Sequence, residues 1–223
     1  MNLLLNFFIG SILGSHALVI VERNHNKSFA SSFSKCDTCE FPLTLFDQIP
    51  IFSFIFKRGR CSHCKQYIPL ITFWVELFSG LIFSNIYLFN SSGFFSGLFL
   101  FFFLVCSIFD YYYLEFETVL LMLPAIIAFL SPTSAIHYYS CTNWFILGLL
   151  LTLMLIMNFR GKFGMGDTLF FLLISLYRGE VFGLHTLLLA SLIFLILYPF
   201  STRHSKLAFL PFLLVSYSFI SLL

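Results

Sequence analysis

Apolar residues occur along the chain in runs, which are separated by short stretches rich in charged residues, glycine, proline or serine. About 20 residues of helix cross roughly 30 Å of hydrocarbon, and several runs approach that length. The pattern therefore predicts an all-α polytopic membrane protein with about eight transmembrane helices. The predicted spans are residues 2–21, 69–89, 94–110, 118–131, 143–159, 167–178, 184–200 and 207–223.

The composition supports this class of protein. Apolar residues make up 59% of the chain and charged residues only 10%, and the mean hydropathy is +0.95. A water-soluble core cannot hold that proportion, so the lipid bilayer is the expected surrounding of most of the chain. The net charge of +2 is too small to indicate a nucleic-acid partner.

One long polar stretch, residues 23–67, interrupts the apolar pattern. It holds seven of the twelve lysines and arginines and four of the six cysteines. We therefore predict a first transmembrane helix at residues 1–22, a cytoplasmic loop at 23–68 and a transmembrane core at 69–223. The first segment has no basic residues before it, so we expect a retained span and not a cleaved signal.

The basic residues also predict the orientation of the chain. With the N-terminus outside, eleven of the twelve lysines and arginines fall on one side, and only Arg178 falls on the other. Positive charge marks the cytoplasmic side of a membrane. We expect a multi-pass protein of the bacterial cytoplasmic (inner) membrane.

Three acids lie in or at the end of apolar spans: Glu76, Asp110 and Asp167. A charge at that depth costs about 2.5–3.5 kcal/mol, so such residues are candidates for function. The predicted topology places Asp110 and Asp167 near the same face. Two neighbouring carboxyl groups would share one proton, which is the apparatus of aspartyl proteolysis. Glu76 fits a partner for a basic side chain and a substrate contact equally well.

The second acid belongs to the element Gly164-Met165-Gly166-Asp167, just before an apolar run. Two glycines would let a substrate backbone approach closely. Simpler interpretations exist for each acid alone. Asp110, followed by three tyrosines, could mark the membrane interface, and Asp167 could cap a helix.

Four cysteines of the polar stretch form two CxxC pairs, Cys36/Cys39 and Cys61/Cys64, separated by 21 residues. This spacing is typical of a zinc ribbon, and metal would stabilise a loop with few apolar residues. Disulfides are the alternative, which a cytoplasmic location disfavours. His63 could replace a cysteine as ligand, but a solvated side chain is the expectation. Cys106 and Cys141 are expected to be isolated thiols.

With these elements in order, the chain resembles the type IV prepilin peptidases of pilus, type II secretion and competence systems. The resemblance rests first on Gly10-Ser11, Gly14-Ser15, the two CxxC pairs, Leu45-Phe46-Asp47-Gln48-Ile49-Pro50, Lys57-Arg58-Gly59-Arg60 and Glu76. It continues with Asp110 and with Gly164 to Asp167. Two positions depart from the family pattern: Phe116-Glu117-Thr118 replaces an Ile-Pro-Asp-like turn, and Leu169 replaces a lysine.

The resemblance implies cleavage of a short basic leader from prepilins or pseudopilins on the cytoplasmic side. It also implies N-methylation of the new N-terminus with S-adenosylmethionine as donor. Asp110 and Asp167 would be catalytic, Gly164 and Gly166 would flank the substrate backbone, and Glu76 and Asp47 would be accessory residues. The four cysteines would hold a structural zinc ion.

Two other classes of function fit parts of the pattern. An ion- or proton-coupled transporter would use the same buried acids, but it has no need for a basic zinc ribbon. A non-catalytic pilus or competence assembly factor would need the ribbon and not the acids.

Overall fold

The computed structural model describes residues 2–26, 35–36, 38–86, 88, 90–114, 118–161, 163–200 and 207–222. Over these residues the regular structure is helical, with two isolated β-bridges and no strand. The predicted all-α fold class is therefore confirmed. The chain divides into two compact units, Met1–Tyr87 and Leu88–Leu223, and each is described by itself.

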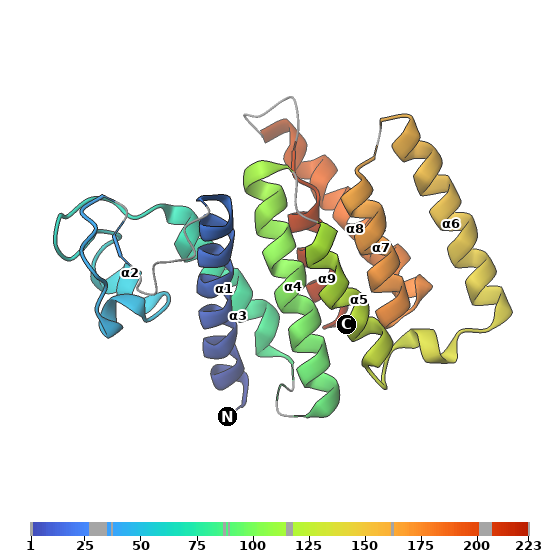
Figure 1. The fold of residues 1–223 in the computed structure, drawn as a ribbon, viewed down its shortest axis with the longest axis horizontal. Helices are drawn as coiled ribbons and strands as arrows, with labels where there is room; N and C mark the ends of the chain where they lie inside the picture. The colour runs from blue at the N-terminus through green and yellow to red at the C-terminus, as the bar shows by residue number, and fades with distance from the viewer. Residues whose placement is uncertain are drawn as a thin grey trace. The chain divides into compact units, whose positions relative to one another are not determined.

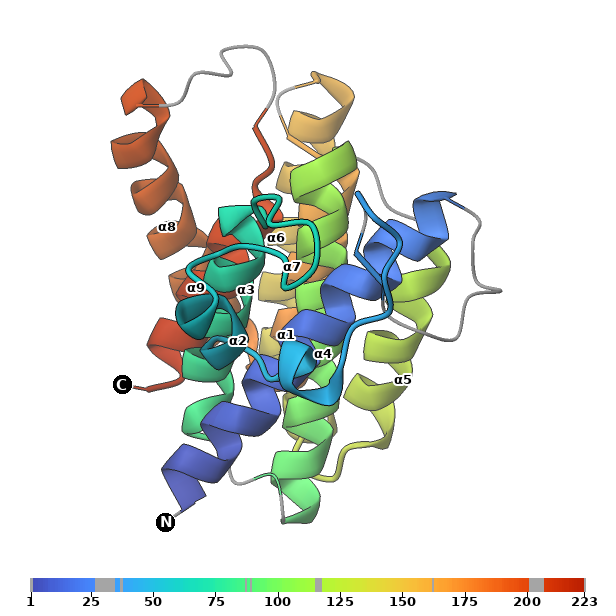
Figure 2. The same ribbon diagram turned by 90° about the vertical axis from the view of Figure 1, so that its left-hand side faces the viewer.

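The first unit is built on two helices, α1 (Asn2–Asn26) and α3 (Leu70–Ser84), which lie side by side in both Figure 1 and Figure 2. Small residues bring them together: a Cβ on Gly10 would lie 2.5 Å from the Cβ of Phe83, and one on Gly14 would overlap Ser79. Small residues four positions apart commonly allow membrane helices to approach closely. The loop between the helices contains η1 (Leu45–Gln48) and α2 (Phe52–Phe56).

The second unit is a bundle of six helices among the described residues. The helices are α4 (Ser91–Tyr113), α5 (Met122–Leu130), α6 (Cys141–Phe159), α7 (Met165–Arg178), α8 (Glu180–Leu197) and α9 (Leu210–Ile220). Short 3-10 turns, η2 (Thr118–Leu121), η3 (Ala135–Tyr138) and η4 (Tyr198–Phe200), lie between them. α4 packs on α5 and α9, α7 packs on α5, α6 and α8, and α6 forms one edge of the bundle (Figure 1).

Aromatic side chains form the core between α4 and α7. Phe103 stacks on Phe170 with ring centroids 4.5 Å apart, and Phe99 stacks on Tyr177 at 4.7 Å. The hydroxyl groups of Tyr177 and Ser96 also meet at 2.8 Å. Ser96 lies near the start of α4 and Tyr177 near the end of α7, so the two helices are antiparallel. The end of α4 and the start of α7 consequently share one end of the bundle.

Each of the eight predicted spans contains a helix. Four candidate spans in the described part of the chain are long and apolar enough to cross a bilayer, namely Leu3–Asn24, Ser91–Tyr113, Cys141–Phe159 and Glu180–Leu197. Three shorter apolar helices are Leu70–Ser84, Val119–Leu130 and Leu210–Ile220. α7 has 14 residues, about 21 Å of helix. These helices indicate a multi-pass membrane protein.

Hydrogen bonds join the segment around residues 139–143 to the end of α7 and the start of α8 in the second unit. The Asn143 side-chain amide donates to Glu180 at 2.7 Å, and the Tyr139 hydroxyl donates to the Ser175 carbonyl at 2.6 Å. Glu180 is a buried acid that sequence analysis did not single out. Because its carboxylate is hydrogen-bonded at this end of the bundle, its role is structural.

Candidate active site and metal site

Asp110 lies in the last turn of α4. Leu114 ends that helix in a left-handed conformation, with φ 57°, and its N–H returns to the Asp110 carbonyl at 2.9 Å. The partly buried carboxylate of Asp110 accepts a hydrogen bond of 3.1 Å from the N–H of Leu210, the first residue of α9. A residue 100 positions away in the chain therefore orients this acid.

Asp167 is the third residue of α7, and Gly164 is the N-cap. The Gly164 N–H donates to the Asp167 carboxylate, an arrangement that satisfies one of the free N–H groups at a helix start. A Cβ on Gly164 would lie only 2.7 Å from Oδ2 of Asp167. The φ of Gly164 is −78°, which any residue adopts, so glycine is needed here for space.

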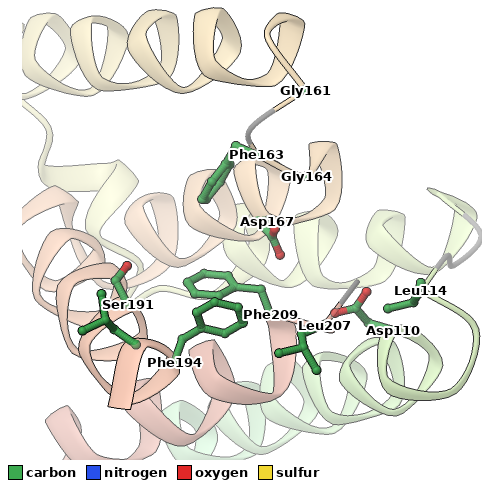
Figure 3. Close-up of a pocket in the computed structure, with 11 residues that line it drawn as sticks. Asp110, Leu114, Gly161, Phe163, Gly164, Asp167, Ser191, Phe194, Leu207 and Phe209 are labelled. Atoms are coloured by element: carbon green, nitrogen blue, oxygen red, sulfur yellow. The ribbon is translucent and has the colours of Figure 1, made fainter. Parts of the chain in front are cut away.

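The two acids line one cavity of about 640 Å³. Figure 3 shows both carboxyl groups directed into this space from different helices. Asp110 comes from the end of α4 and Asp167 from the start of α7. Most of the remaining wall is apolar. It is formed by Leu114, Gly161, Phe163, Gly164, Ser191, Phe194, Leu195, Leu207 and Phe209.

This arrangement can support acid–base chemistry. Two carboxyl groups that meet at one water cannot both ionise cheaply, so such a pair can share one proton. The charged member can then take a proton from water while the protonated member donates to a carbonyl oxygen. A cavity of this volume with an apolar wall can also hold side chains of a peptide. The site is therefore chemically suited to peptide hydrolysis.

The two CxxC motifs form two turns of the same design. In each, the first cysteine donates its N–H to the carbonyl five residues on, at 2.9–3.0 Å. The residue four positions after that cysteine has a positive φ and donates to the cysteine carbonyl. A β-bridge closes each turn. The equivalent residues are Cys36, Glu40 and Phe41 in the first turn and Cys61, Lys65 and Gln66 in the second.

The four cysteines converge on one point. Their Sγ atoms lie within 4.8 Å of one another, and those of Cys36 and Cys64 are 3.9 Å apart. A tetrahedral zinc ion with bonds of about 2.3 Å would separate its sulfur ligands by about 3.8 Å, so the cluster fits. All six cysteines of the chain are free thiols.

The backbone favours the ligand form of one of these thiols. The N–H groups of Cys64 and His63 lower the pKa of Cys61 to about 6, which stabilises the thiolate. The His63 ring itself stacks on Phe41, with centroids 4.5 Å apart and nearly parallel planes. His63 therefore lies outside the cluster, as the sequence predicted.

Asp47 connects η1 to the second cysteine turn. Its Oδ2 accepts from both the N–H and the hydroxyl of Thr44 at 2.8 Å. Its Oδ1 accepts from the Ser62 hydroxyl at 2.9 Å and forms an ion pair with Lys57. These donors occupy both carboxylate oxygens, so Asp47 supports the fold of the loop.

Glu76 connects the loop to α3. Its Oε2 accepts the N–H of Ile51 at 2.8 Å, and the Ser15 hydroxyl of α1 is a second donor. Ile51 has a φ of 64°, an unusual value for a β-branched residue. The sequence suggested a basic side chain or a substrate as the partner of Glu76. The structure instead gives it two other partners, a hydroxyl group and the N–H of a residue with an unusual backbone conformation.

Some predicted features are not brought to the cavity. Among the described residues that line it, Gly164 is present and Gly166 is not. Two residues at which the sequence departs from the family pattern, Phe116 and Glu117, lie outside the described residues. So do four basic residues: Lys27, Lys162, Arg203 and Lys206. Conversely, sequence analysis missed the segment 207–210, which contributes Leu207 and Phe209 to the wall. No local pattern marks that segment, because its role depends on a contact across the bundle.

Comparisons with known proteins find two similarities, one of them to a family model that matches the N-terminal part of the chain. Residues 8–89 match the family described as the Bacterial Peptidase A24 N-terminal domain. The chain is also 31% identical over 84 residues to a prepilin leader peptidase/N-methyltransferase of Vibrio cholerae serotype O1. That match covers 34% of this chain and 33% of the relative, so it spans about a third of the relative's length. No solved structure matches the chain.

These matches confirm the resemblance to the type IV prepilin peptidases, and the family match covers most of the first unit. The family match covers α1 from Phe8 onward, both cysteine turns and α3. The cavity with Asp110 and Asp167 lies beyond the family match, so its role is argued from its own geometry.

Proposed function

We propose that this chain is an intramembrane aspartyl endopeptidase that cleaves the basic leader of type IV prepilins or pseudopilins. The observation that carries the proposal is the pair of acids, Asp110 and Asp167, which lie 57 positions apart in sequence and line one cavity. The match of residues 8–89 to a peptidase A24 domain supports a peptidase, and the similarity to a prepilin leader peptidase/N-methyltransferase supports the substrate class. A transporter would leave the cysteine cluster without a role.

In this proposal the dyad hydrolyses one peptide bond at the membrane surface. One carboxylate removes a proton from water, and the hydroxyl adds to the scissile carbonyl while the other acid protonates its oxygen. The nitrogen of the departing peptide then takes a proton from the dyad as the C–N bond breaks. The hydrogen bond from Leu210 holds Asp110 in place, and Gly164 leaves room for Asp167.

The cysteine cluster is proposed to bind a structural zinc ion. Cys36, Cys39, Cys61 and Cys64 would be its ligands, and the metal would stabilise the loop between α1 and α3. N-methylation with S-adenosylmethionine stays a prediction from the family resemblance. Incubating the purified protein with prepilin and a labelled methyl donor tests it, with cleavage and label incorporation read separately.

The proposal also includes an orientation in the bacterial inner membrane. The N-terminus would lie outside, and the cavity would open toward the cytoplasmic face, where the basic leader of the substrate lies. The antiparallel arrangement of α4 and α7 supports one part of this: it brings Asp110 and Asp167 to the same end of the bundle.

Co-expression with a prepilin in a host that lacks its own prepilin peptidase tests the function. Asp110→Ala and Asp167→Ala should each abolish processing and leave the amount of protein in the membrane unchanged. Glu180→Gln is the matched control, because this buried acid lies at the other end of the bundle and an amide oxygen can still accept from Asn143. Lack of processing by the wild-type chain would reject the protease assignment.

The same variants separate the alternatives. Wild-type processing by either aspartate variant would reject the dyad. If both aspartate variants support pilus assembly fully while the Cys61→Ser variant does not, the chain is an assembly factor.

A further inference from the structure

The cavity that holds the two acids also has a wall on α8, and this wall carries a hydroxyl group. Among the described residues that line the cavity, three have polar side chains: Asp110, Asp167 and Ser191. The two acids are assigned to the chemistry, and Ser191 is separate from them. Figure 3 shows Ser191 near Phe194, on the other side of the cavity from Asp110. A substrate that reaches the acids can therefore extend to Ser191.

This wall lies on the outward face of α8. Leu188, Leu192 and Leu195 follow one face of the helix, and their exposed fractions are 60%, 51% and 72%. Ser191 belongs to the same face, one turn before Leu195, and is exposed too. Because α8 is a candidate membrane span, this apolar face meets hydrocarbon. The cavity therefore extends from the helix ends that carry the acids to the lipid-facing side of α8.

Ser191 can accept a hydrogen bond in this position. It lies six residues before the end of α8, about 9 Å along the helix. Its hydroxyl donates to the Leu187 carbonyl of the same helix at 2.8 Å, so its proton has a partner. A hydroxyl oxygen also has two lone pairs, and no described residue donates to this one. The side chain is therefore an acceptor for a ligand in the cavity.

An apolar peptide that is cut in this cavity needs such an acceptor. Each carbonyl inside an α-helix is bound by an N–H, so the helix must open before water and the acids can act on a peptide bond. Opening the helix frees N–H groups, and hydrocarbon offers them no partner. The Gly164 carbonyl is already used by the N–H and the hydroxyl of Thr168, at 3.3 and 3.2 Å. Ser191 is the neutral side-chain acceptor among the described lining residues.

We propose that Ser191 is a substrate-binding residue, whose oxygen accepts a backbone N–H of the substrate where an apolar membrane segment opens its helix. The segment enters the cavity from the lipid-facing side of α8, and the peptide bond to be cut lies at Asp110 and Asp167. The polar leader stays at the helix ends. This inference rests on the proposed protease function, to which it adds a contact and a route of entry.

The kinetics of prepilin cleavage by the full chain in nanodiscs test the contact. Ser191→Val and Ser191→Thr have side chains of the same shape, and only threonine keeps the hydroxyl. We expect KM of the Ser191→Val variant to be about three- to tenfold above that of Ser191→Thr, with equal kcat, because the contact exists before and during the chemical step. Thr152→Val is the matched control and should leave KM unchanged, because Thr152 is exposed on α6 and donates to its own helix at 2.8 Å, away from the cavity. Equal KM values for the two Ser191 variants overturn the proposal and leave the hydroxyl with the Leu187 carbonyl alone.

A second measurement identifies the N–H group. Synthetic prepilin peptides carry one backbone ester, which lacks the N–H, at successive positions near the cut. At the position that meets Ser191, the ester should raise KM of the wild-type chain about as much as Ser191→Val does, and it should not raise KM of the Ser191→Val variant further. Esters that act equally on both chains at every position overturn the proposal. If the wild-type chain cleaves no prepilin, the protease function itself is rejected, and the proposal with it.

Discussion

Gly164→Ala adds one methyl group beside a proposed catalytic acid. The new Cβ would lie 2.7 Å from Oδ2 of Asp167, whereas ordinary contact begins at about 3.4 Å, so the carboxylate must move by about 0.7 Å (3.4 − 2.7). The backbone at Gly164 already has angles that alanine adopts, so the change acts through this contact alone. A misplacement of about 1 Å in an active site can cost about 100-fold in rate. We therefore expect kcat/KM to fall roughly 30- to 100-fold, equivalent to about 2–3 kcal/mol.

The assay is cleavage of a purified prepilin by the variant reconstituted in nanodiscs. Gly148→Ala is the control, because Gly148 lies within α6 and its Cβ would meet nothing within 4 Å. This variant should cleave at the wild-type rate and unfold no more easily. If the Gly164→Ala variant keeps more than about a third of wild-type activity, the contact with Asp167 does not govern the geometry of the dyad, and the argument from Gly164 is wrong.

Further predictions concern the support of the dyad and the metal site. Leu210→Pro removes the N–H that binds Asp110, and proline is tolerated at a helix start. Its cleavage rate should be about tenfold or more below that of Leu210→Ala, which keeps the N–H. Equal rates would contradict the role of this hydrogen bond in positioning Asp110. Cys61→Ser should lower both zinc content and protein level, measured by elemental analysis and immunoblot, and Cys141→Ser should lower neither. Because the pKa of Cys61 in the folded protein, about 6, is below its usual value, the thiolate contributes stability that is complete above the usual value and lost as pH falls through 6. Zinc retention should therefore decrease on acidification, and retention that is constant from pH 8 to about 5 would argue against thiolate ligation. Lys65 has a φ of 61°, so Lys65→Gly should make zinc harder to remove by a chelator, by about 1 kcal/mol, and Lys65→Val should make it easier.

The helices were predictable because their signal is local. Each apolar run contains a helix, since a run of that length must satisfy its backbone internally in lipid. Their limits were less predictable. The helix predicted at 94–110 continues to Tyr113 and ends at the left-handed Leu114. The span predicted at 118–131 is a 3-10 turn followed by a nine-residue helix.

The candidate site was predictable only in part, because only some of its features have a local signal in the sequence. Asp110 and Asp167 stand out because charge is rare in apolar runs. Their surroundings do not, since the hydrogen bond from Leu210 to Asp110 joins segments 100 positions apart. The same holds for Glu76, whose partner Ile51 lies 25 positions away. The boundary between the two units also depends on contacts between distant segments. Residues 69–84 were predicted with the core, yet α3 packs on α1 through Gly10 and Gly14, which sequence analysis had noted only as part of a family motif.

The most direct test of the central claim is a double-mutant cycle on the dyad in the prepilin cleavage assay. The rate constant is measured for the chain with Asp110→Asn, with Asp167→Asn and with both changes. If the two carboxyl groups share one proton and act as one unit, each single change removes about as much activity as the two together. Two partial losses that add in free energy, or a single variant that cleaves at the wild-type rate, would contradict the account.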